Sequence, residues 1–320
     1  MELTLITHKP WLVATVIVSL MAGARPLRHD LSPPATTKLT GLFPHIPFDD
    51  AFSDFYGGKN VRRVDNGSSV DLVLDEFSGS GFKSKDVFFH GFFSAAVKLP
   101  PGFAAGVVVA FYMSSSEVFA KNHDEIDFEL LGHEKEKEWV LQTNLYGNDS
   151  LRTGREEKFH LWFDPAEDFH EYSILWNYHH IVFMVDNIPV REVNHSEVMK
   201  AYPSKPMSLY STIWDGSNWT RHGAKKHINY NHAPFMASFQ GFELQGCLWN
   251  QSLSSLSTSS CYGMNGIKID LDPIDGQQFA KLSEAQKVGM KWVRDEFMFY
   301  SYCKDTQRYL VMPPECSRQK

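Results

Sequence analysis

Ten consecutive residues, 123–132 with the sequence H-D-E-I-D-F-E-L-L-G, constrain the fold of this chain more than any other stretch. Within them three acids, Glu125, Asp127 and Glu129, alternate with three apolar residues. Side chains alternate across a β-strand, so such a strand presents carboxylates on one face and apolar groups on the other. The apolar face belongs against a second sheet, and the acidic face belongs in water or in a cleft. No Lys or Arg lies within the stretch, so repulsion is expected to raise the pKa of at least one carboxyl group.

The rest of the chain reads as many short β-strands separated by turn residues. Strands are expected at residues 69–74, 87–99, 106–113, 139–146, 158–163, 172–176, 181–185, 207–214 and 237–244. Because no helical pattern lies between these runs, the sequence predicts an all-β fold, an antiparallel sandwich. Residues 25 to about 50 contain five prolines and are expected to form an irregular lead-in.

One helix is expected after the strands. Ser283 can cap it, and Gln286, three residues on, completes a capping box. Four apolar residues recur at rough helical spacing: Leu282, Val288, Trp292 and Phe299. The helix leads into Cys303, so residues 246–320 are expected to form a disulfide-tied extension after a main domain at 25–245.

The first 24 residues have the pattern of a signal peptide. His8 and Lys9 precede an apolar stretch, residues 11–24, that ends in A-G-A, a small-x-small cleavage site. The stretch is shorter than the roughly 20 residues that span a membrane. We therefore expect a secreted chain with no membrane association after cleavage, and an uncleaved signal anchor is the alternative.

The four cysteines, all late in the chain, fit an oxidising compartment. Four cysteines allow three pairings, and sequence proximity favours Cys247–Cys261 and Cys303–Cys316. No C-x-x-C motif is present, which argues against a thiolate metal site. Secretion also makes five sequons candidates for glycosylation: Asn66, Asn148, Asn194, Asn218 and Asn250.

Composition narrows the classes of partner. The net charge is −7 and no long basic run occurs, so nucleic acid is not expected as a partner. Hydrophobic residues make up 43% of the chain, which is ordinary for a globular protein with a sizeable core. Aromatic residues make up 14%, and rings beyond the needs of the core can form stacking surfaces for sugars.

The acidic strand has the residues that glycoside hydrolysis with retention requires. That reaction uses a nucleophilic carboxylate and an acid/base carboxyl about 5–5.5 Å apart. Glu125 and Glu129 share a face, but their Cα atoms would lie roughly 13 Å apart on a straight strand, so the strand must bend and both side chains must lean inward. Asp127, between them, can hydrogen-bond to the nucleophile and orient it. The alternation alone fits a solvated acidic strand or a Ca²⁺ site equally well.

Longer motifs favour the enzyme. The ten-residue stretch resembles the active-site strand of glycoside hydrolase family 16, in particular its plant xyloglucan endotransglucosylase/hydrolase branch. Further segments similar to that branch follow in order along nearly the whole mature chain: 142–144, 161–165, 172–177, 185–191, 213–216, 218–219 and 300–303. Four late cysteines in two local pairs are also similar to the branch.

The resemblance implies a curved β-jelly-roll sandwich of the concanavalin-like kind, whose C-terminal extension lengthens the acceptor side of the cleft. It implies that Glu125 is the nucleophile, Glu129 the acid/base and Asp127 the helper. By the same resemblance the substrate-binding residues are Gln142 and Asn144 near the reaction centre, with Trp214, Asp215, Gly216, Trp219, Gly223, Tyr300 and Arg308 on the acceptor side. No cofactor and no metal are implied.

Two positions depart from the branch. Asn218 stands where many relatives have an acid, and it creates a sequon; a glycan there would crowd the acceptor site, so we expect Asn218 to be unmodified. Lys158 stands where relatives often carry Arg, so planar bidentate contact with a sugar is lost. Asn148 lies soon after the catalytic strand, where the branch commonly carries its glycan, and is the best sequon.

The expected function is that of a secreted, monomeric cell-wall enzyme of the apoplast. It would cleave the backbone of xyloglucan with retention and transfer it to another xyloglucan chain or to an oligosaccharide acceptor. Two alternatives stay open: an enzyme that works mainly as a xyloglucan endohydrolase, and a non-catalytic β-glucan-binding module.

Overall fold

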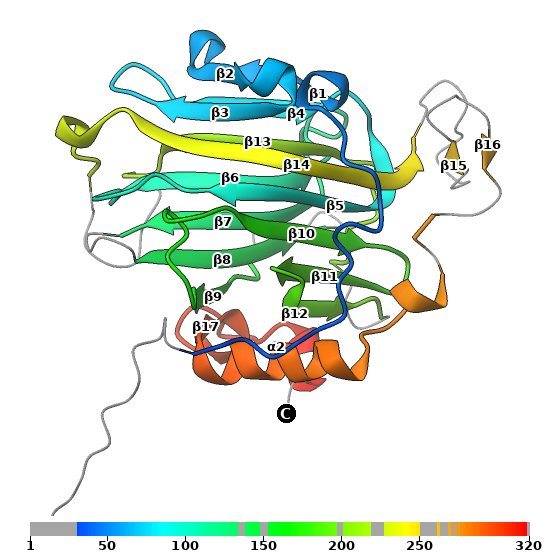
Figure 1. Cartoon of the computed structure of the whole chain (residues 1–320). Helices are drawn as coiled ribbons and strands as arrows, with labels where there is room; N and C mark the ends of the chain where they lie inside the picture. Colours follow the sequence, from blue (N-terminus) through cyan, green and yellow to red (C-terminus); the bar gives the residue numbers. More distant parts are fainter. Residues whose placement is uncertain are drawn as a thin grey trace, which may run out of the picture.

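The computed structural model describes residues 31–133, 138–147, 153–196, 201–218, 227–249, 261–262, 268–269, 273–274 and 276–318. Two antiparallel β-sheets stack face to face, as the sequence predicts (Figure 1). The first sheet has the strand order β1-β4-β13-β6-β7-β8-β9-β17. Its strands are β1 (Phe52–Tyr56), β4 (Ser80–Ser84), β6 (Val107–Ser114), β7 (Glu125–Gly132), β8 (Trp139–Tyr146), β9 (Glu157–His160), β13 (Ser208–Asp215) and β17 (Met298–Ser301).

The second sheet has the order β12-β11-β10-β5-β14-β15-β16, with β3 pairing with β14 and β2 with β3. Its strands are β2 (Val61–Val64), β3 (Ser69–Leu74), β5 (Phe88–Lys98), β10 (His170–Trp176), β11 (His180–Val185), β12 (Ile188–Asn194), β14 (Phe235–Leu248), β15 (Cys261–Tyr262) and β16 (Lys268–Ile269). The expected strands at 69–74 and 139–146 are confirmed at their bounds. The sequence did not predict β1, β2, β4, β12 or β17, which have only four to seven residues and weak apolar periodicity.

The apolar face of β7 lies in the core between the sheets, as its alternation predicts. Ile126, Phe128 and Leu130 are all buried there. The ring of Phe128 packs edge-on against Tyr172 of β10 and Phe183 of β11, with centroid distances of 5.8 and 5.2 Å. Burial of these side chains fixes which face of β7 meets the second sheet, because a slip of one residue would turn the acids into the core.

The lead-in crosses the outer face of the second sheet, where Figure 1 shows it in dark blue. A second cluster of buried residues lies beneath it, including Leu39, Phe92 and Phe279. Asn187, in the turn before β12, accepts hydrogen bonds from the backbone N–H groups of Leu39 (2.7 Å) and Thr40 (2.9 Å). The part of the lead-in that the structure describes, from residue 31 on, is therefore held in place although it forms no strand.

The predicted helix is present as α2 (Glu284–Glu296), the longer of two described α-helices, the other being α1 (Phe48–Ala51). Its capping box is confirmed: Ser283 N–H donates to Gln286 Oε1 (2.9 Å), and Gln286 N–H donates to Ser283 Oγ (3.3 Å). The predicted apolar spacing is wrong in part. Val288 is exposed, and Phe299 lies beyond the helix in β17, because the helix ends at Glu296.

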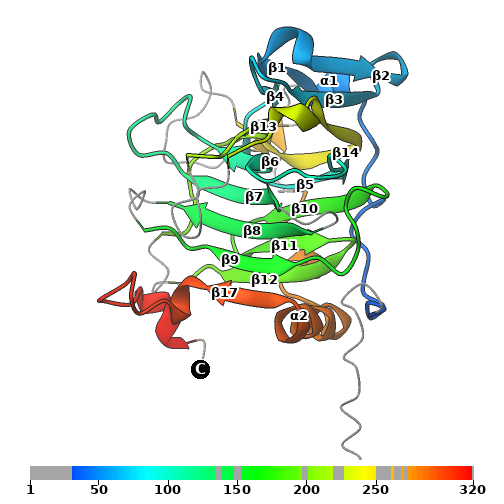
Figure 2. The ribbon, with the colours of Figure 1, turned by 90° about the vertical axis from the view of Figure 1, so that its left-hand side faces the viewer.

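The C-terminal extension is continuous with the first sheet. Figure 2 shows β17 and α2 at the β9 end of the molecule, and β17 pairs with β9. The disulfide Cys303–Cys316 is confirmed, with 5.2 Å between the Cα atoms. Cys247 is also disulfide-bonded, but the side chain of its expected partner Cys261 lies outside the described residues. The domain boundary expected at 245–246 falls inside β14.

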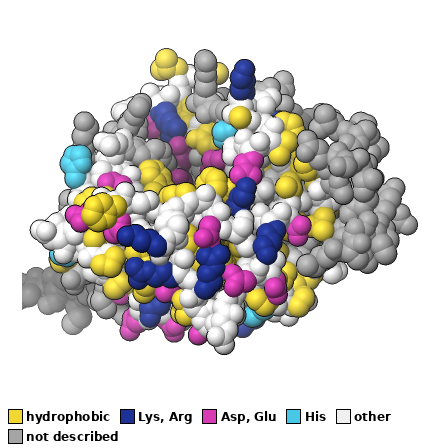
Figure 3. All heavy atoms as spheres, turned by 90° about the horizontal axis from the view of Figure 1, so that it is seen from above, with side chains coloured by type: hydrophobic (Ala, Val, Ile, Leu, Met, Phe, Trp, Pro, Cys, Tyr) yellow, Lys and Arg dark blue, Asp and Glu magenta, His cyan; other side chains and the backbone are white. Residues whose placement is uncertain are grey.

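Charges of both signs are interspersed on the face that carries β1 to β3 (Figure 3). Arg63 there pairs with Asp49 (3.1 Å) and Asp54 (2.6 Å). Within the described ranges, no helix is long and apolar enough to cross a membrane. The expected signal peptide, residues 1–24, lies outside those ranges.

Candidate active site

The three acids of β7 lie on the face of the first sheet that points away from the core, which we call the carboxylate face. β7 is flanked by β6 and β8, so each acid has a neighbour on either side. The opposing residues are Ser114 and Tyr146 for Glu125, Tyr112 and Asn144 for Asp127, and Ala110 and Gln142 for Glu129. The register therefore brings the predicted residues Gln142 and Asn144 beside the acids.

The start of β7 is anchored by Asp124, which precedes the first catalytic candidate. Its buried carboxylate accepts hydrogen bonds from the backbone N–H groups of Ser204 (2.6 Å) and Lys205 (2.9 Å) and from Lys205 Nζ (2.8 Å). His123, the residue before Asp124, contacts the first acid of β7: its Nε2 atom lies 3.5 Å from Glu125 Oε2. That contact with Glu125 raises the pKa of His123.

The acids of β7 perturb one another, as the sequence predicts. Burial, followed by the charges of Glu125 and Glu129, raises the pKa of Asp127 well above its usual range. Asp127 also hydrogen-bonds to Glu125, which fits an orienting role. Burial raises the pKa of Glu129 to about 7, with added repulsion from Glu125 and Glu156. A carboxyl group with such a pKa can hold a proton near neutral pH and donate it.

The two amides of β8 are held by specific hydrogen bonds. Gln142 Nε2 donates to Glu129 Oε2, which orients the carboxyl group of the acid/base candidate. Asn144 Oδ1 accepts from the backbone N–H of Arg155 (2.7 Å). Because that oxygen is already bonded, Asn144 can offer its amide N–H groups to neighbours on the carboxylate face.

Lys158 and Tyr300 meet at the β9–β17 edge of the carboxylate face. The two residues are opposite each other in register, and Lys158 Nζ lies 5.6 Å from the centre of the Tyr300 ring. Tyr300 Oη donates to Asp305 (2.9 Å). Arg308 forms a bidentate pair with Glu156 at 2.7 and 3.0 Å. The structure thus brings both predicted acceptor-side residues of the extension, Tyr300 and Arg308, near β9, although the guanidinium group of Arg308 is paired with Glu156.

The other predicted acceptor residues are only partly described. Trp214 is half-buried near the end of β13, the strand expected at 207–214. Asp215 is exposed and accepts a hydrogen bond from Tyr230 Oη (2.8 Å). Gly216 is buried, and a Cβ there would lie 2.5 Å from Val108 Cγ2, so it allows close packing. Trp219 and Gly223 lie outside the described residues, and Asn218 is exposed.

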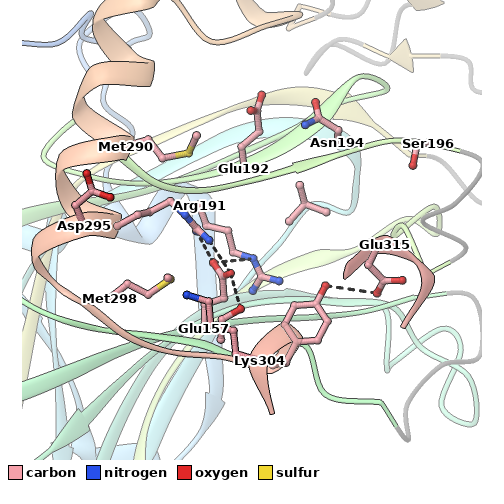
Figure 4. A pocket seen from close by; sticks show the side chains of 14 residues that line it. Glu157, Arg191, Glu192, Asn194, Ser196, Met290, Asp295, Met298, Lys304 and Glu315 are labelled. Carbon is pink, nitrogen blue, oxygen red and sulfur yellow. Dashed lines mark hydrogen bonds and ion pairs between the residues drawn. The ribbon is translucent and has the colours of Figure 1, made fainter. Parts of the chain in front are cut away.

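Sequence reasoning missed a cluster of charged side chains on the core face of the same sheet. Glu157 of β9 accepts two hydrogen bonds from Arg294 of α2, at 2.7 and 3.0 Å, and one from Ser301 (3.1 Å). Arg191 of β12 donates to Thr143 O (3.2 Å) and lies 3.7 Å from Glu157 (Figure 4). The cluster lines a crevice between α2, β12 and β17. Its hydrogen bonds connect β8 to β12 and β9 to α2 on the core side of the sheet.

Three of the five predicted sequons lie among the described residues. Asn66 and Asn194 are exposed, the first in a turn with φ of 57° and the second at the end of β12. Asn148 and Asn250 lie outside the described residues. Among the residues that are described, no group of three or more His, Cys, Asp or Glu side chains could hold a metal ion.

Comparisons with known proteins agree with the sequence motifs. Residues 48–232 match the family model for glycosyl hydrolases family 16, and residues 273–316 match the model for the C-terminus of xyloglucan endo-transglycosylase. The chain is 46% identical over 275 residues to probable xyloglucan endotransglucosylase/hydrolase protein 28 of Arabidopsis thaliana, covering 85% of this chain and 80% of that protein. It is 38% identical to a xyloglucan endotransglucosylase/hydrolase of Brassica oleracea var. botrytis, covering 86% and 89%.

Solved structures share the fold. The Bacillus licheniformis β-glucanase superposes with a TM-score of 0.52 at 20% identity, covering 66% of this chain and all of that one. Crh5 transglycosylase in complex with NAG superposes with a TM-score of 0.53 at 21% identity, covering 68% and 88%. The matches to both family models and to the plant relatives show that the chain belongs to glycoside hydrolase family 16 and, within it, to the xyloglucan endotransglucosylase/hydrolase family.

Proposed function

We propose that this chain is a secreted, monomeric cell-wall enzyme of the apoplast that cleaves the β-1,4-glucan backbone of xyloglucan and transfers it to another xyloglucan or oligosaccharide acceptor. The plant relatives are named for this substrate, and the carboxylate face supplies the groups that the reaction needs. The observation that carries the proposal is the pair of environments on β7: a Glu129 carboxyl with a pKa of about 7 beside a Glu125 that Asp127 and His123 contact.

In the first step Glu125 attacks a glucosyl anomeric carbon, and Glu129 protonates the leaving glycosidic oxygen. A covalent glycosyl-enzyme forms. In the second step Glu129, now ionised, accepts a proton from a hydroxyl group of the acceptor, which attacks the anomeric carbon and releases Glu125. This mechanism requires the two carboxyl groups to come within about 5–5.5 Å of each other around the sugar.

Transfer exceeds hydrolysis where the acceptor is bound well enough to exclude water from the intermediate. The side chains of Lys158 and Tyr300 on the edge beside Glu129 favour such binding. Incubation with xyloglucan and a fluorescent xyloglucan oligosaccharide tests it: we expect label to enter the polymer. Chain shortening without label uptake would instead identify an endohydrolase.

A second experiment tests the assignment of the nucleophile. Glu125→Gln is nearly isosteric and should abolish turnover while xyloglucan binding in affinity electrophoresis persists. Product stereochemistry followed by proton NMR should show retention in the wild type. Turnover by Glu125→Gln, or inversion by the wild type, would refute the mechanism, and binding without turnover by the wild type would support a non-catalytic module.

A further inference from the structure

Arg191 is a buried cation that the proposed mechanism does not use. It lies in β12 of the second sheet, and only 3% of its surface is exposed. Figure 4 shows its side chain beside Glu157, and its Nε atom lies 3.7 Å from a carboxylate oxygen of that residue. Glu157 is bound more closely by Arg294, at 2.7 and 3.0 Å. Because burying a charge is costly unless the group is also hydrogen-bonded, the position of Arg191 requires partners other than Glu157.

The hydrogen-bond partners of Arg191 lie across the core, in the first sheet. Its Nη1 atom donates to the carbonyl oxygen of Thr143 (3.2 Å), to Thr143 Oγ1 (3.1 Å) and to the carbonyl oxygen of Arg155 (2.7 Å). Thr143 lies in β8 opposite Glu157, the first residue of β9, so these bonds form where the pairing of the two strands stops. The guanidinium group therefore ties the backbone of β8 to the segment that leads into β9.

The backbone that these bonds hold adjoins the two amides of the carboxylate face. Gln142 and Asn144 are the chain neighbours of Thr143. Gln142 Nε2 donates to Glu129 Oε2, and Asn144 Oδ1 accepts from the backbone N–H of Arg155 (2.7 Å). Neighbouring residues of a strand point to opposite faces, so a backbone fixed from the core side determines where both amides stand.

We propose that Arg191 is a positioning residue for the acid/base: from the core side it fixes the backbone of β8 so that Gln142 holds the carboxyl group of Glu129. The inference rests on the proposed function, since it takes Glu129 as the acid/base. The hydrogen bonds of Arg191 reach the core side of β8, so its effect on Glu129 passes through Gln142. A displacement of about 1 Å, caused by a change far from the reacting atoms, can lower a rate about 100-fold.

Arg191→Lys tests the positioning role without removing the charge. A lysine side chain ends one bond short of Nη1, so its ammonium group stays near Glu157 but does not reach the acceptors on the first sheet. We expect kcat for transfer to a labelled xyloglucan oligosaccharide to fall about 10- to 100-fold, with KM changed by less than about 3-fold. The fall of kcat/KM with pH should move to higher pH, because the hydrogen bond from Gln142 opposes the effect of burial and lowers the pKa of Glu129. A role in stability alone, or a role of the charge alone, would leave kcat per folded molecule and this pH dependence unchanged.

A double-mutant cycle tests whether Arg191 acts through Gln142. Gln142→Leu removes the amide group that contacts Glu129. In that background Arg191→Lys should lower kcat by less than about 2-fold further, and it should leave the pH dependence where Gln142→Leu puts it, because both changes remove the same contact. Full additivity of the two effects would overturn the inference.

Leu72→Ala is the matched control for a loss of stability. Leu72 is buried in β3, which pairs with β14 and lies away from β12 in the second sheet. The cavity should lower the melting temperature and leave kcat per folded molecule and its pH dependence unchanged. The same shift of the pH dependence in Leu72→Ala, or a wild-type kcat and pH dependence in Arg191→Lys, would overturn the inference.

Thr143→Val decides the question if Arg191→Lys does not fold. It removes only the Oγ1 acceptor and nearly keeps the shape of the side chain, so kcat should fall about 2- to 5-fold with a shift of the pH dependence in the same direction. Wild-type behaviour of Thr143→Val would then overturn the inference. If the wild type neither cleaves nor transfers xyloglucan, the proposed function falls together with this inference; if the wild type is active and these variants behave like it, the inference alone falls.

Discussion

Two carboxyl groups of the first sheet, those of Asp127 and Glu157, are similarly buried, but their pKa values are shifted in opposite directions. Asp127 on the carboxylate face is 5% exposed, and Glu157 on the core face is 1% exposed. Burial and the neighbouring acids raise the pKa of Asp127. Burial would also raise the pKa of Glu157, but Arg191, Arg294 and Ser301 together hold it below its usual range. Partners, and not depth, decide the sign of the shift.

This difference in pKa distinguishes charged groups that stabilise the fold from charged groups that take part in the proposed reaction. Glu157 is paired by side chains from the second sheet and from α2, so its negative charge joins three parts of the molecule. Asp127 and Glu129 have acids as neighbours along β7, and Glu129 receives an amide hydrogen bond from Gln142 instead of a paired countercharge. Repulsion on the carboxylate face costs stability, and it leaves Glu129 able to exchange a proton near neutral pH.

The largest expected effect removes the proton carried by Glu129. Glu129→Gln keeps the shape of the side chain but cannot act as acid or base, so the rate of transfer to a labelled oligosaccharide should fall about 10²- to 10⁴-fold. Glu296→Gln, at the exposed end of α2, is the control and should keep full activity. Near wild-type transfer by Glu129→Gln would place the acid/base elsewhere.

Glu157→Gln should affect the fold instead. It leaves Arg191 and Arg294 without their buried counter-charge, and losing one partner of a buried pair costs about 3–5 kcal/mol of unfolding free energy. Urea unfolding measures the loss. Lys291→Gln breaks an exposed pair with Asp295 on the same helix and should cost under about 0.5 kcal/mol. Equal stabilities of the two variants would contradict the contrast between the two faces.

Glu129→Gln should also raise stability, in the opposite direction to Glu157→Gln. The folded-state pKa of Glu129, about 7, lies above its unfolded value of about 4.3. Between these two pKa values the folded chain therefore holds a proton that the unfolded chain has lost. The stability that this proton contributes is fully present below about pH 4.3 and is lost as the pH rises through about 7. The melting temperature of Glu129→Gln should exceed that of the wild type at pH 8 and match it at pH 4. A lower value at pH 8 would show that the charge of Glu129 is compensated.

The smallest expected effect concerns the pH dependence of transfer. Since the acid form of Glu129 is needed first, kcat/KM should fall as pH rises through about 7. The charge of Lys158 lowers the pKa of Glu129, so Lys158→Gln should move this limb to higher pH by a fraction of a unit. Lys291→Gln should leave its position unchanged. If the fall of kcat/KM moved to lower pH in Lys158→Gln, the charge of Lys158 would not be lowering the pKa of Glu129.

The sequence predicted what depends on neighbours along the chain. The alternation of Glu125, Asp127 and Glu129 has a period of two, so it determined both the strand and the face that the acids share. The capping box of α2 was likewise predictable, because Ser283 and Gln286 lie within one turn. Here the local pattern and the fold agree.

Contacts between distant segments could not be predicted in this way. Arg294 and Glu157 are 137 residues apart in sequence, and only the pairing of β17 with β9 and the packing of α2 bring them together. The stacking of the Tyr112 and Tyr210 rings likewise depends on the pairing of β6 with β13, two strands that are distant in sequence. Phe299 was misplaced because helical spacing was counted past the end of α2 at Glu296, whereas Val288 lies within the helix but on its exposed side.

The pairing of β17 with β9 has a consequence for how this chain can be shortened. β17 is the last strand of the first sheet at that end, so a chain cut at residue 245 would leave β9 as the edge strand, with the backbone N–H and C=O groups that face β17 unpaired. An unprotected edge of this kind is a template for strand addition by another molecule. Because β17 of the extension pairs with this edge of β9, loss of the extension is expected to reduce solubility before activity can be measured.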